Sequence, residues 1–157
     1  MRIAVGSDER NHLTDFVAEE LRRRGFDVQL FGPLKGEPLP WADVAEQVDH
    51  RVAGGEADQG VLFCWTGTGV SMAANKVPGV RAALCGDAET ARGARAWNQA
   101  NVLCLSLRAT SEIVAREILD AWLTAQTDPS EAGNVERVNE MDRRYRTDQA
   151  AASSGRE

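Results

Sequence analysis

The fold is decided by the stretch Val61-Leu62-Phe63-Cys64-Trp65-Thr66-Gly67-Thr68-Gly69-Val70-Ser71-Met72-Ala73-Ala74-Asn75-Lys76. Three apolar residues run into a cysteine, then into a Thr/Gly loop, then into small residues that favour a helix. This order predicts a strand, a loop and a helix, with Cys64 at the carboxyl end of the strand. Open parallel α/β sheets bind ligands outside the carboxyl ends of their strands. Glycines let the backbone approach a ligand closely, and N–H groups at a helix N-terminus bind an oxyanion. We therefore expect the chemistry of this chain at this loop.

Outward from this stretch, strand and helix patterns alternate along the chain. Strands are predicted at 2–6, 27–31, 60–63, 80–84 and 102–105. Helical periodicity fills the intervals and follows the last strand, with Asp87 as the N-cap of the helix that runs to about Asn98. The alternation predicts a right-handed, doubly wound parallel sheet in a three-layer α/β/α, Rossmann-like sandwich. The expected strand order is 2-1-3-4-5.

A further helix is expected after Gln126-Thr127-Asp128-Pro129, where the character of the chain changes. Its apolar positions are Val135, Val138, Met141 and Tyr145. A late amphipathic helix beyond a linker packs on its own domain or on a partner subunit, and we expect it to dock across a dimer interface. Residues 1–148 are predicted to form a single domain, and residues 149–157 a flexible C-terminal tail.

Composition excludes several classes of function. The chain has 157 residues, of which 43% are hydrophobic and 27% charged, as in an ordinary globular domain. Its net charge of -6 gives no reason to expect a nucleic acid or membrane partner. No apolar run approaches the roughly 18 residues of a membrane span, and Met-Arg-Ile-Ala-Val at the start predicts a strand and not a signal peptide. A cytoplasmic protein is expected.

Metal and cofactor dependence are not expected. The three cysteines show no C-x-x-C spacing, and Cys85 and Cys104 are interpreted as small buried apolar residues. Neither His12 nor His50 is spaced as a metal ligand, and no carboxylates cluster in the sequence. The loop also lacks the glycine patterns of nucleotide-binding proteins.

The central motif resembles that of a known family. Phe63-Cys64-Trp65-Thr66-Gly67-Thr68-Gly69, continued by Ala73-Ala74-Asn75-Lys76-Val77-Pro78-Gly79-Val80-Arg81, is similar to the C-G-T-G-x-G and A-A-N-K-x-x-G-x-R runs of the ribose-5-phosphate isomerase B and galactose-6-phosphate isomerase family. The similarity extends to Gly6-Ser7-Asp8 and Asn98-Gln99-Ala100-Asn101, and spans residues 1 to about 145. The resemblance implies a homodimer, with a tetramer as the alternative, that interconverts aldose and ketose phosphates without metal.

The resemblance also implies roles for particular residues. Cys64 corresponds to the base that removes a proton beside the substrate carbonyl to give a cis-enediolate. Thr66 corresponds to the hydroxyl that moves protons between the two substrate oxygens, and Asn98 to an amide near the enediolate. Residue chemistry agrees with this, because a helix N-terminus favours a thiolate and loop amides stabilise an oxyanion. The candidate substrate-binding residues are Asp8, Glu9, Trp41, Trp65, Gly67, Thr68, Gly69, Trp97, Arg108 and Arg137.

The chain departs from the family pattern at positions that bind the substrate. Glu9 stands where the family has a first-loop histidine, and Trp97 where it has the histidine thought to open the sugar ring. Trp65 replaces a glycine, and Gly133 falls near a position where an arginine is common. Glu9 would repel a phosphate dianion. The hypothesis that follows is a short substrate that is already acyclic, such as a tetrose or tetrulose derivative, or a different or unphosphorylated sugar.

Alternatives stay open at each level. Cys64 can be a structural thiol, Thr66 a plain helix N-cap, and Asn98 a left-handed residue that ends its helix. Trp41 and Trp97 can cover the core, and an arginine such as Arg108 or Arg137 can be a solvated side chain. For the whole chain, the alternatives are an epimerase that uses the same base and a catalytically silent sugar- or anion-binding homologue.

Overall fold

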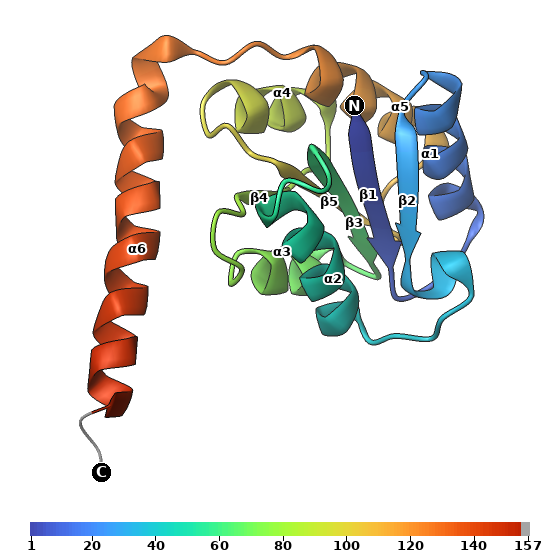
Figure 1. The fold of residues 1–157 in the computed structure, drawn as a ribbon. Coiled ribbons are helices and arrows are strands. Elements are labelled where there is room, and N and C mark those ends of the chain that lie inside the picture. The colour runs from blue at the N-terminus through green and yellow to red at the C-terminus, as the bar shows by residue number, and fades with distance from the viewer. Residues whose placement is uncertain (155–157) are drawn as a thin grey trace.

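The computed structural model describes the backbone of residues 1–154 and the side chains of residues 1–146 (Figure 1). Its centre is a five-stranded sheet in which every strand pair is parallel. The strands are β1 (Arg2–Ser7), β2 (Asp27–Phe31), β3 (Gln59–Cys64), β4 (Ala82–Leu84) and β5 (Val102–Ser106). Each strand lies within two residues of its predicted bounds, so the predicted α/β class is confirmed.

The strand order is β2-β1-β3-β5-β4, which corrects the expected order 2-1-3-4-5 at one edge of the sheet. β5 pairs with β3 from Gly60↔Val102 to Cys64↔Ser106. Residues of an inner strand are covered on both faces and must be apolar. Four of the five residues of β5 are buried, whereas none of the three residues of β4 is. The longer and more buried strand, β5, therefore takes the inner place, and the short, partly exposed β4 forms the edge.

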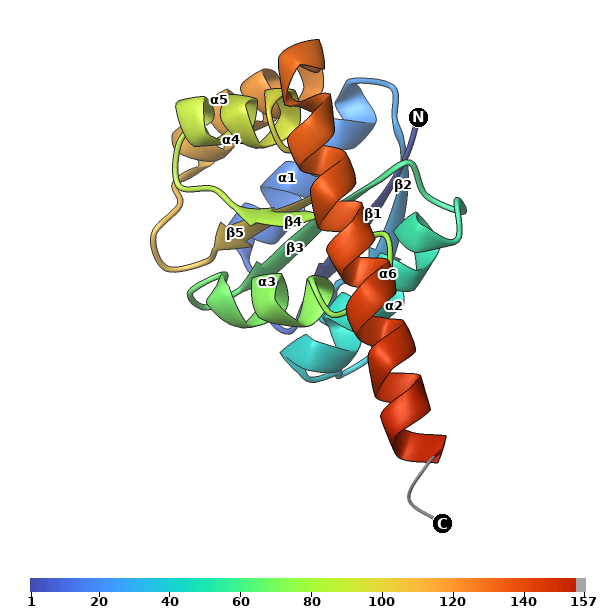
Figure 2. The ribbon, with the colours of Figure 1, turned by 90° about the vertical axis from the view of Figure 1, so that its left-hand side faces the viewer.

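Helices cover both faces of the sheet (Figures 1 and 2). The helices are α1 (His12–Arg23), α2 (Trp41–Ala53), α3 (Thr68–Ala74), α4 (Ala88–Ala96), α5 (Glu112–Thr124) and α6 (Ala132–Ser154), with short 3-10 turns η1 (Gly32–Lys35) and η2 (Pro129–Glu131). α1, α4 and α5 pack together on one face, and α2 and α3 on the other. The expected three-layer sandwich with an extra C-terminal helix is confirmed.

Two hydrophobic cores follow from the alternation of side chains along each strand. On β3, Val61 and Phe63 belong to the core under α1, α4 and α5, whereas Leu62 and Cys64 belong to the core under α2 and α3. Cys104 lies in the second core and is fully buried, and Cys85 lies in the first with 1% exposure. Their interpretation as buried apolar residues is confirmed. Burial raises the pKa of the Cys85 thiol to about 12, with the charge of Asp87 as a further cause.

Polar side chains cap α1 and α4. Asn11 accepts hydrogen bonds from the backbone N–H groups of Leu13 and Thr14, and the Thr14 hydroxyl accepts one from the Asn11 N–H. This reciprocal capping box fixes the start of α1. Asp87 accepts a hydrogen bond of 2.7 Å from Thr90 N at the start of α4, as expected from the sequence.

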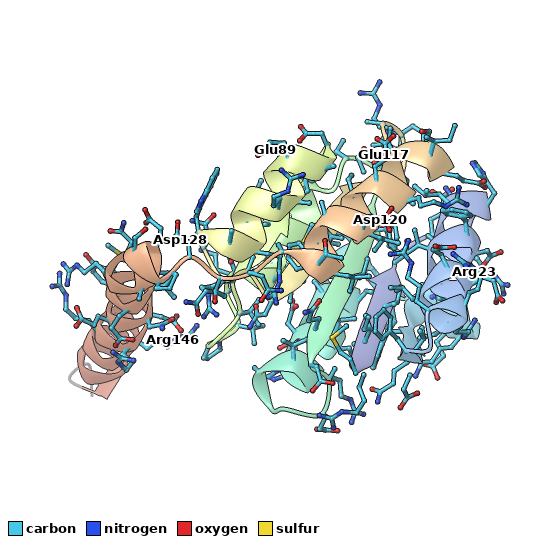
Figure 3. All side chains as sticks on the ribbon, turned by 90° about the horizontal axis from the view of Figure 1, so that it is seen from above. Arg23, Glu89, Glu117, Asp120, Asp128 and Arg146 are labelled. Carbon is cyan, nitrogen blue, oxygen red and sulfur yellow. The ribbon has the colours of Figure 1, made fainter. Side chains whose placement is uncertain are left out.

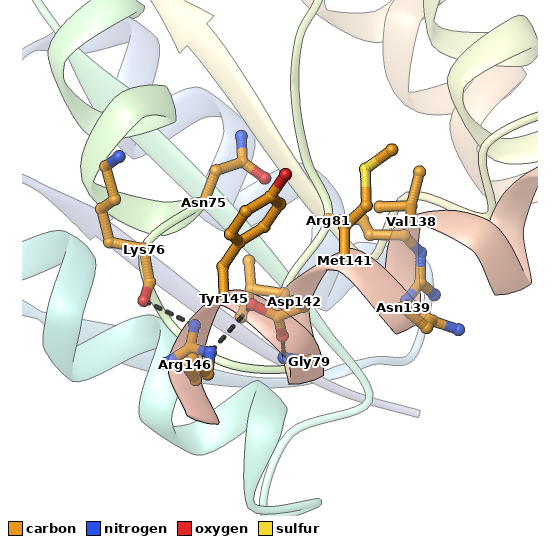
Figure 4. A pocket seen from close by; sticks show the side chains of 11 residues that line it. Asn75, Lys76, Gly79, Arg81, Val138, Asn139, Met141, Asp142, Tyr145 and Arg146 are labelled. Carbon is orange, nitrogen blue, oxygen red and sulfur yellow. Dashed lines mark hydrogen bonds and ion pairs between the residues drawn. The ribbon is translucent and has the colours of Figure 1, made fainter. Parts of the chain in front are cut away.

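α6 leaves the sandwich as a long helix that contacts the body along one side (Figure 2). Val135 is buried, whereas Val138, Met141 and Tyr145 are exposed. Asp142 accepts a hydrogen bond from Gly79 N, and a cavity of about 620 Å³ lies between α6 and residues 75–81 (Figure 4). The sequence predicts a tail at 149–157, but residues 149–154 belong to the end of α6. Residues 155–157 lie outside the described part of the chain.

The outer faces of the helices are charged. Viewed from above, Glu89 lies on α4, and Glu117 and Asp120 lie on α5 (Figure 3). Asp120 pairs with Arg24 across a distance of 2.7 Å. Of the helices that the structure describes, none has the length and apolar character needed to cross a membrane.

Candidate active site

The Cys64 loop has a conformation that depends on Gly67. Cys64 ends β3 opposite Ser106 of β5, and Gly67 begins α3 with a φ of +77°. A Cβ atom on Gly67 would lie 2.5 Å from the Leu84 Cδ1 atom and 3.0 Å from the Leu105 carbonyl carbon. Only glycine fits this backbone and this space. The turn brings the first N–H groups of α3, which have no partner within the helix, to the same end of the sheet as Cys64.

Thr66 is not the N-cap of α3, so that alternative is wrong. Gly67 occupies the cap position, and no side chain caps the helix. The Thr66 hydroxyl instead lies 2.7 Å from the Thr68 hydroxyl, and both threonines are exposed. The hydroxyl of Thr66 is therefore available to a ligand at the loop.

Arg108 lies beside the same loop. Its backbone N–H donates to the Trp65 carbonyl at 3.1 Å, and the Ser106 hydroxyl donates to that carbonyl at 2.9 Å. The Arg108 side chain and Thr66 line a common cavity of about 380 Å³ at the carboxyl ends of β4 and β5. Arg108, a candidate substrate-binding residue, thus lies beside the Cys64 loop of its own chain.

Asp8 and Glu9 form an acidic pair at the end of β1. Ser7, the last residue of β1, pairs with Phe63 of β3. Asp8 and Glu9 come directly after Ser7, so they lie at the same end of the sheet as Cys64. The Ser7 hydroxyl donates to the Glu9 carbonyl at 2.5 Å and accepts from the Glu9 N–H, which fixes the turn. The Asp8 Oδ1 atom is buried and has no hydrogen-bond partner among the described residues. Burial raises the pKa of Asp8, and the charge of Glu9 raises it further.

Two tryptophans border this edge. Trp41, at the start of α2, packs on α3: a Cβ atom on Gly69 would lie 3.1 Å from the Trp41 Cε3 atom. The exposed fractions of Trp41 and Trp65 are 44% and 59%. Neither ring is part of the core, and Cys64, with 5% exposure, is the most buried of the candidate residues at this edge that are not glycine.

The remaining candidates lie elsewhere in the chain. Trp97 and Asn98 follow α4 and precede β5, so they lie near its amino end, whereas Cys64 lies opposite its carboxyl end. Four residue steps along β5 separate these ends by about 13 Å. Arg137 lies on α6 and pairs with Glu140. Asn98 and Trp97 line a second cavity, of about 280 Å³, with residues of α6. Within one chain, the candidate residues therefore fall into two groups.

Asn98 does not adopt the left-handed conformation considered for it. Trp97 is the C-cap of α4, and the positive φ, +48°, belongs to Gln99. The Trp97 ring folds back on α4, where a Cβ atom on Gly93 would lie 2.6 Å from it. Trp97 is 51% exposed, so it does not cover the core either.

The sequence motif contains two residues whose contacts were not anticipated. The Asn75 side chain binds the backbone of Ala82 through both its amide nitrogen and its oxygen, which joins the end of α3 to β4. Arg81 binds the turn that carries Asn98. Both residues belong to the A-A-N-K-x-x-G-x-R run, which marks them in the sequence. The motif alone does not predict which contacts they make.

No three His, Cys, Asp or Glu side chains of the described residues come together as a metal site. The arrangement at the Cys64 edge offers instead a thiol, free backbone N–H groups, a hydroxyl and an arginine. These groups suit proton transfer next to an oxygen that becomes negative.

Comparison with known proteins agrees with this class of site. The family model described as Ribose/Galactose Isomerase matches residues 3–141. Ribose-5-phosphate isomerase B of Escherichia coli K12 is 39% identical over 126 residues, which cover 80% of this chain and 85% of that protein. D-erythrulose-4-phosphate isomerase of Pectobacterium atrosepticum is 35% identical, with coverage of 88% and 93%. The structure of Clostridium thermocellum ribose-5-phosphate isomerase B superposes with a TM-score of 0.86 at 37% identity, with coverage of 92% and 99%.

The fold and the site define an isomerase of the sugar-phosphate type. The chain belongs to the ribose/galactose isomerase family. The resemblance seen in the sequence and the expected enzyme class, an aldose–ketose isomerase, are both confirmed.

Proposed function

We propose that this chain isomerises a short, acyclic sugar phosphate, with Cys64 as the base. The Cys64 thiolate removes the proton from the carbon beside the carbonyl, and the electron pair moves onto the carbonyl oxygen to give a cis-enediolate. Thr66 transfers a proton between the two oxygens, and the Cys64 thiol returns its proton to the neighbouring carbon. The observation that carries this proposal is the joint placement of Cys64, Thr66, Arg108 and the N-terminus of α3 at one edge of the sheet.

The backbone amides of the loop serve the enediolate. The N–H groups at the start of α3 have no partner within the helix and lie next to the end of β3. Each preorganised donor of this kind contributes a few kcal/mol to the stabilisation of an oxyanion in mutational studies, about 3 kcal/mol per donor.

Trp97 supports a four-carbon substrate. A four-carbon sugar phosphorylated on its terminal hydroxyl has no free hydroxyl that can close a five-membered ring, so it needs no ring opening. A tryptophan in the place of the ring-opening histidine is then without cost. The relative named D-erythrulose-4-phosphate isomerase, 35% identical to this chain, agrees with a tetrulose phosphate as substrate. Arg108 is proposed to bind the phosphate.

A homodimer is proposed to complete the site. Asn98 lies near the amino end of β5 and Cys64 opposite its carboxyl end, so a second copy would present Asn98, and with it Arg137 of α6, to the open end of the sheet at Cys64. The exposed apolar side chains of α6, Val138, Met141 and Tyr145, supply an apolar surface for this association. Asp8, Glu9, Trp41 and Trp65 are proposed to line the substrate pocket on the Cys64 side.

Exchange in deuterium oxide tests the proposal. The chain is incubated with four-, five- and six-carbon aldoses and ketoses, free and phosphorylated, and deuterium beside the carbonyl is measured by NMR. We expect incorporation and isomerisation with a tetrulose 4-phosphate, loss of both in Cys64→Ala, and retention in Cys104→Ala, the matched control on β5. Exchange without net isomerisation but with an epimeric product would indicate the epimerase. Tight binding without exchange would indicate a silent binding protein, and either result would refute the proposed reaction.

A further inference from the structure

Arg81 joins three segments that are distant in the sequence. Its Nε atom donates to the carbonyls of Asn98 and Gln99, each at 3.1 Å, and its Nη2 atom donates to the Gln99 carbonyl at 2.8 Å. Its Nη1 atom donates to the Asn139 side chain of α6 at 3.2 Å. Its backbone binds Asn101, whose amide oxygen accepts from Arg81 N at 2.8 Å. One residue thus holds the turn after α4, the start of β4 and α6. Figure 4 shows Arg81 beside Asn139 of α6.

Among the described residues, the Arg81 guanidinium binds backbone carbonyl groups and not a carboxylate. Within the part of the chain whose side chains are described, Arg81 forms no ion pair with a carboxylate. The turn follows the end of α4, and Arg95 adds a hydrogen bond of 2.6 Å to the carbonyl of Ala100. Two arginines therefore bind three successive carbonyls.

The bound turn is strained. Gln99 is the one non-glycine residue with a positive φ in the described backbone, at +48°. A left-handed conformation costs a non-glycine residue about 1–2 kcal/mol. Such a conformation persists only where the surroundings enforce it. Two hydrogen bonds from Arg81 to the Gln99 carbonyl hold the peptide that follows Gln99, and a third, to the Asn98 carbonyl, holds the peptide that precedes it. Arg81 therefore binds both peptides that flank the left-handed residue.

We propose that Arg81 is the positioning residue for Asn98: its guanidinium sets the conformation of the Asn98–Gln99 turn and ties that turn to α6. This inference rests on the proposed function in one respect, namely that Asn98 acts on the substrate. A planar guanidinium can bind two carbonyls and an amide oxygen at once, whereas the single ammonium group of lysine cannot reproduce this geometry. Since Asn139 and Arg137 lie on the same helix, Arg81 also couples the orientation of Asn98 to that of a candidate phosphate ligand.

Kinetics of Arg81 variants test the positioning role. In Arg81→Lys we expect kcat to fall about 10- to 100-fold, the loss typical of a displaced catalytic group, with a smaller change in KM. Free guanidinium ion at non-denaturing concentration should restore part of kcat in Arg81→Ala but none in Asn98→Ala. Arg92→Ala is the matched control, because Arg92 is an exposed arginine of α4 that pairs with Glu89. Equal kcat values for Arg81→Lys and Arg92→Ala would overturn the inference.

NMR of the ligand-free protein separates this inference from the proposed function. The side-chain amide signals of Asn98 and the backbone signals of Gln99 and Ala100 should shift in Arg81→Lys, with faster hydrogen exchange in the turn, and should not shift in Arg92→Ala. A wild-type protein without turnover on any sugar phosphate would refute the proposed function while these signals still report the hold of Arg81 on the turn. Unchanged signals in Arg81→Lys would refute the inference even if the wild type is active.

Discussion

Gly67 links the backbone of the Cys64 loop to the packing beneath it. A side chain there would have a left-handed φ and would overlap Leu84 and Leu105. Gly79 is a natural comparison, because its φ is +80° but no atom lies within 4 Å of the place that a Cβ atom would take. Both positions impose backbone strain on an alanine, whereas only position 67 adds steric overlap.

We predict that Gly67→Ala destabilises the fold more than Gly79→Ala does. The shared strain is about 1–2 kcal/mol, and overpacking adds about 1–3 kcal/mol at position 67. Urea denaturation measures both variants. The Gly67→Ala variant should also lose isomerase activity. Equal free energies of unfolding for the two variants would show that the space around Gly67 adapts without cost.

Asp49 is a buried carboxyl group of α2 with no function assigned to it. It is fully buried, and neither of its oxygens has a hydrogen-bond partner among the described residues. Burial raises its pKa from 3.8 to about 7. Between pH 4 and pH 7 the folded protein keeps a proton that the unfolded chain has released. The contribution of Asp49 to stability therefore falls as pH rises through this window and is constant above it.

We predict that Asp49→Asn stabilises the protein above pH 7 and not at pH 4. Each pKa unit corresponds to about 1.4 kcal/mol, so the gain is a few kcal/mol. The free energy of unfolding in urea, measured at several pH values, checks this. Asp43→Asn, an exposed position on the same helix, is the control. A gain that does not change with pH would mean that the pKa of Asp49 is the same in the folded and the unfolded chain, which contradicts the prediction.

The sequence patterns predict the secondary-structure elements themselves better than they predict the order of the strands in the sheet. Every strand, the helix capped by Asp87 and the late helix were predictable, because each has a local periodicity or capping signal. The position of β4 in the sheet could not be predicted, because the order of the strands depends on how the helices and strands pack, which has no local signal in the sequence. The left-handed conformation of Gln99 was also missed. It depends on Arg81, a contact between residues 18 positions apart in the sequence.

The end of α4 is the element where substrate choice is expected to reside. Trp97 packs on Gly93, and its indole ring is neither an acid nor a base that could open a sugar ring. We predict that Trp97→His, combined with Glu9→His, raises turnover of ribose 5-phosphate relative to a tetrulose 4-phosphate by at least about 10-fold, a modest part of what general acid–base catalysis supplies. Ratios of kcat/KM measure this. An unchanged ratio would show that specificity is set elsewhere.

Within one chain, the candidate site residues form two separate groups. Cys64, Thr66 and Arg108 share one edge of the sheet, whereas Asn98 and Arg137 lie toward the other end. The resemblance to the family predicted these residues as one site, but the sequence does not state whether they come from one copy or from two. The proposal of two copies depends on the strand directions and on the position of α6.

Subunit complementation tests this arrangement most directly. Cys64→Ala and Asn98→Ala are each expected to be inactive. After co-expression, half of the randomly formed dimers are mixed and each has one intact site of two, so about one quarter of wild-type activity is expected. Cys64→Ala with Arg108→Ala, two changes on the same half of the site, should give none. Recovered activity in the first mixture alone would establish a site built from two copies around Cys64; no recovery there would contradict it.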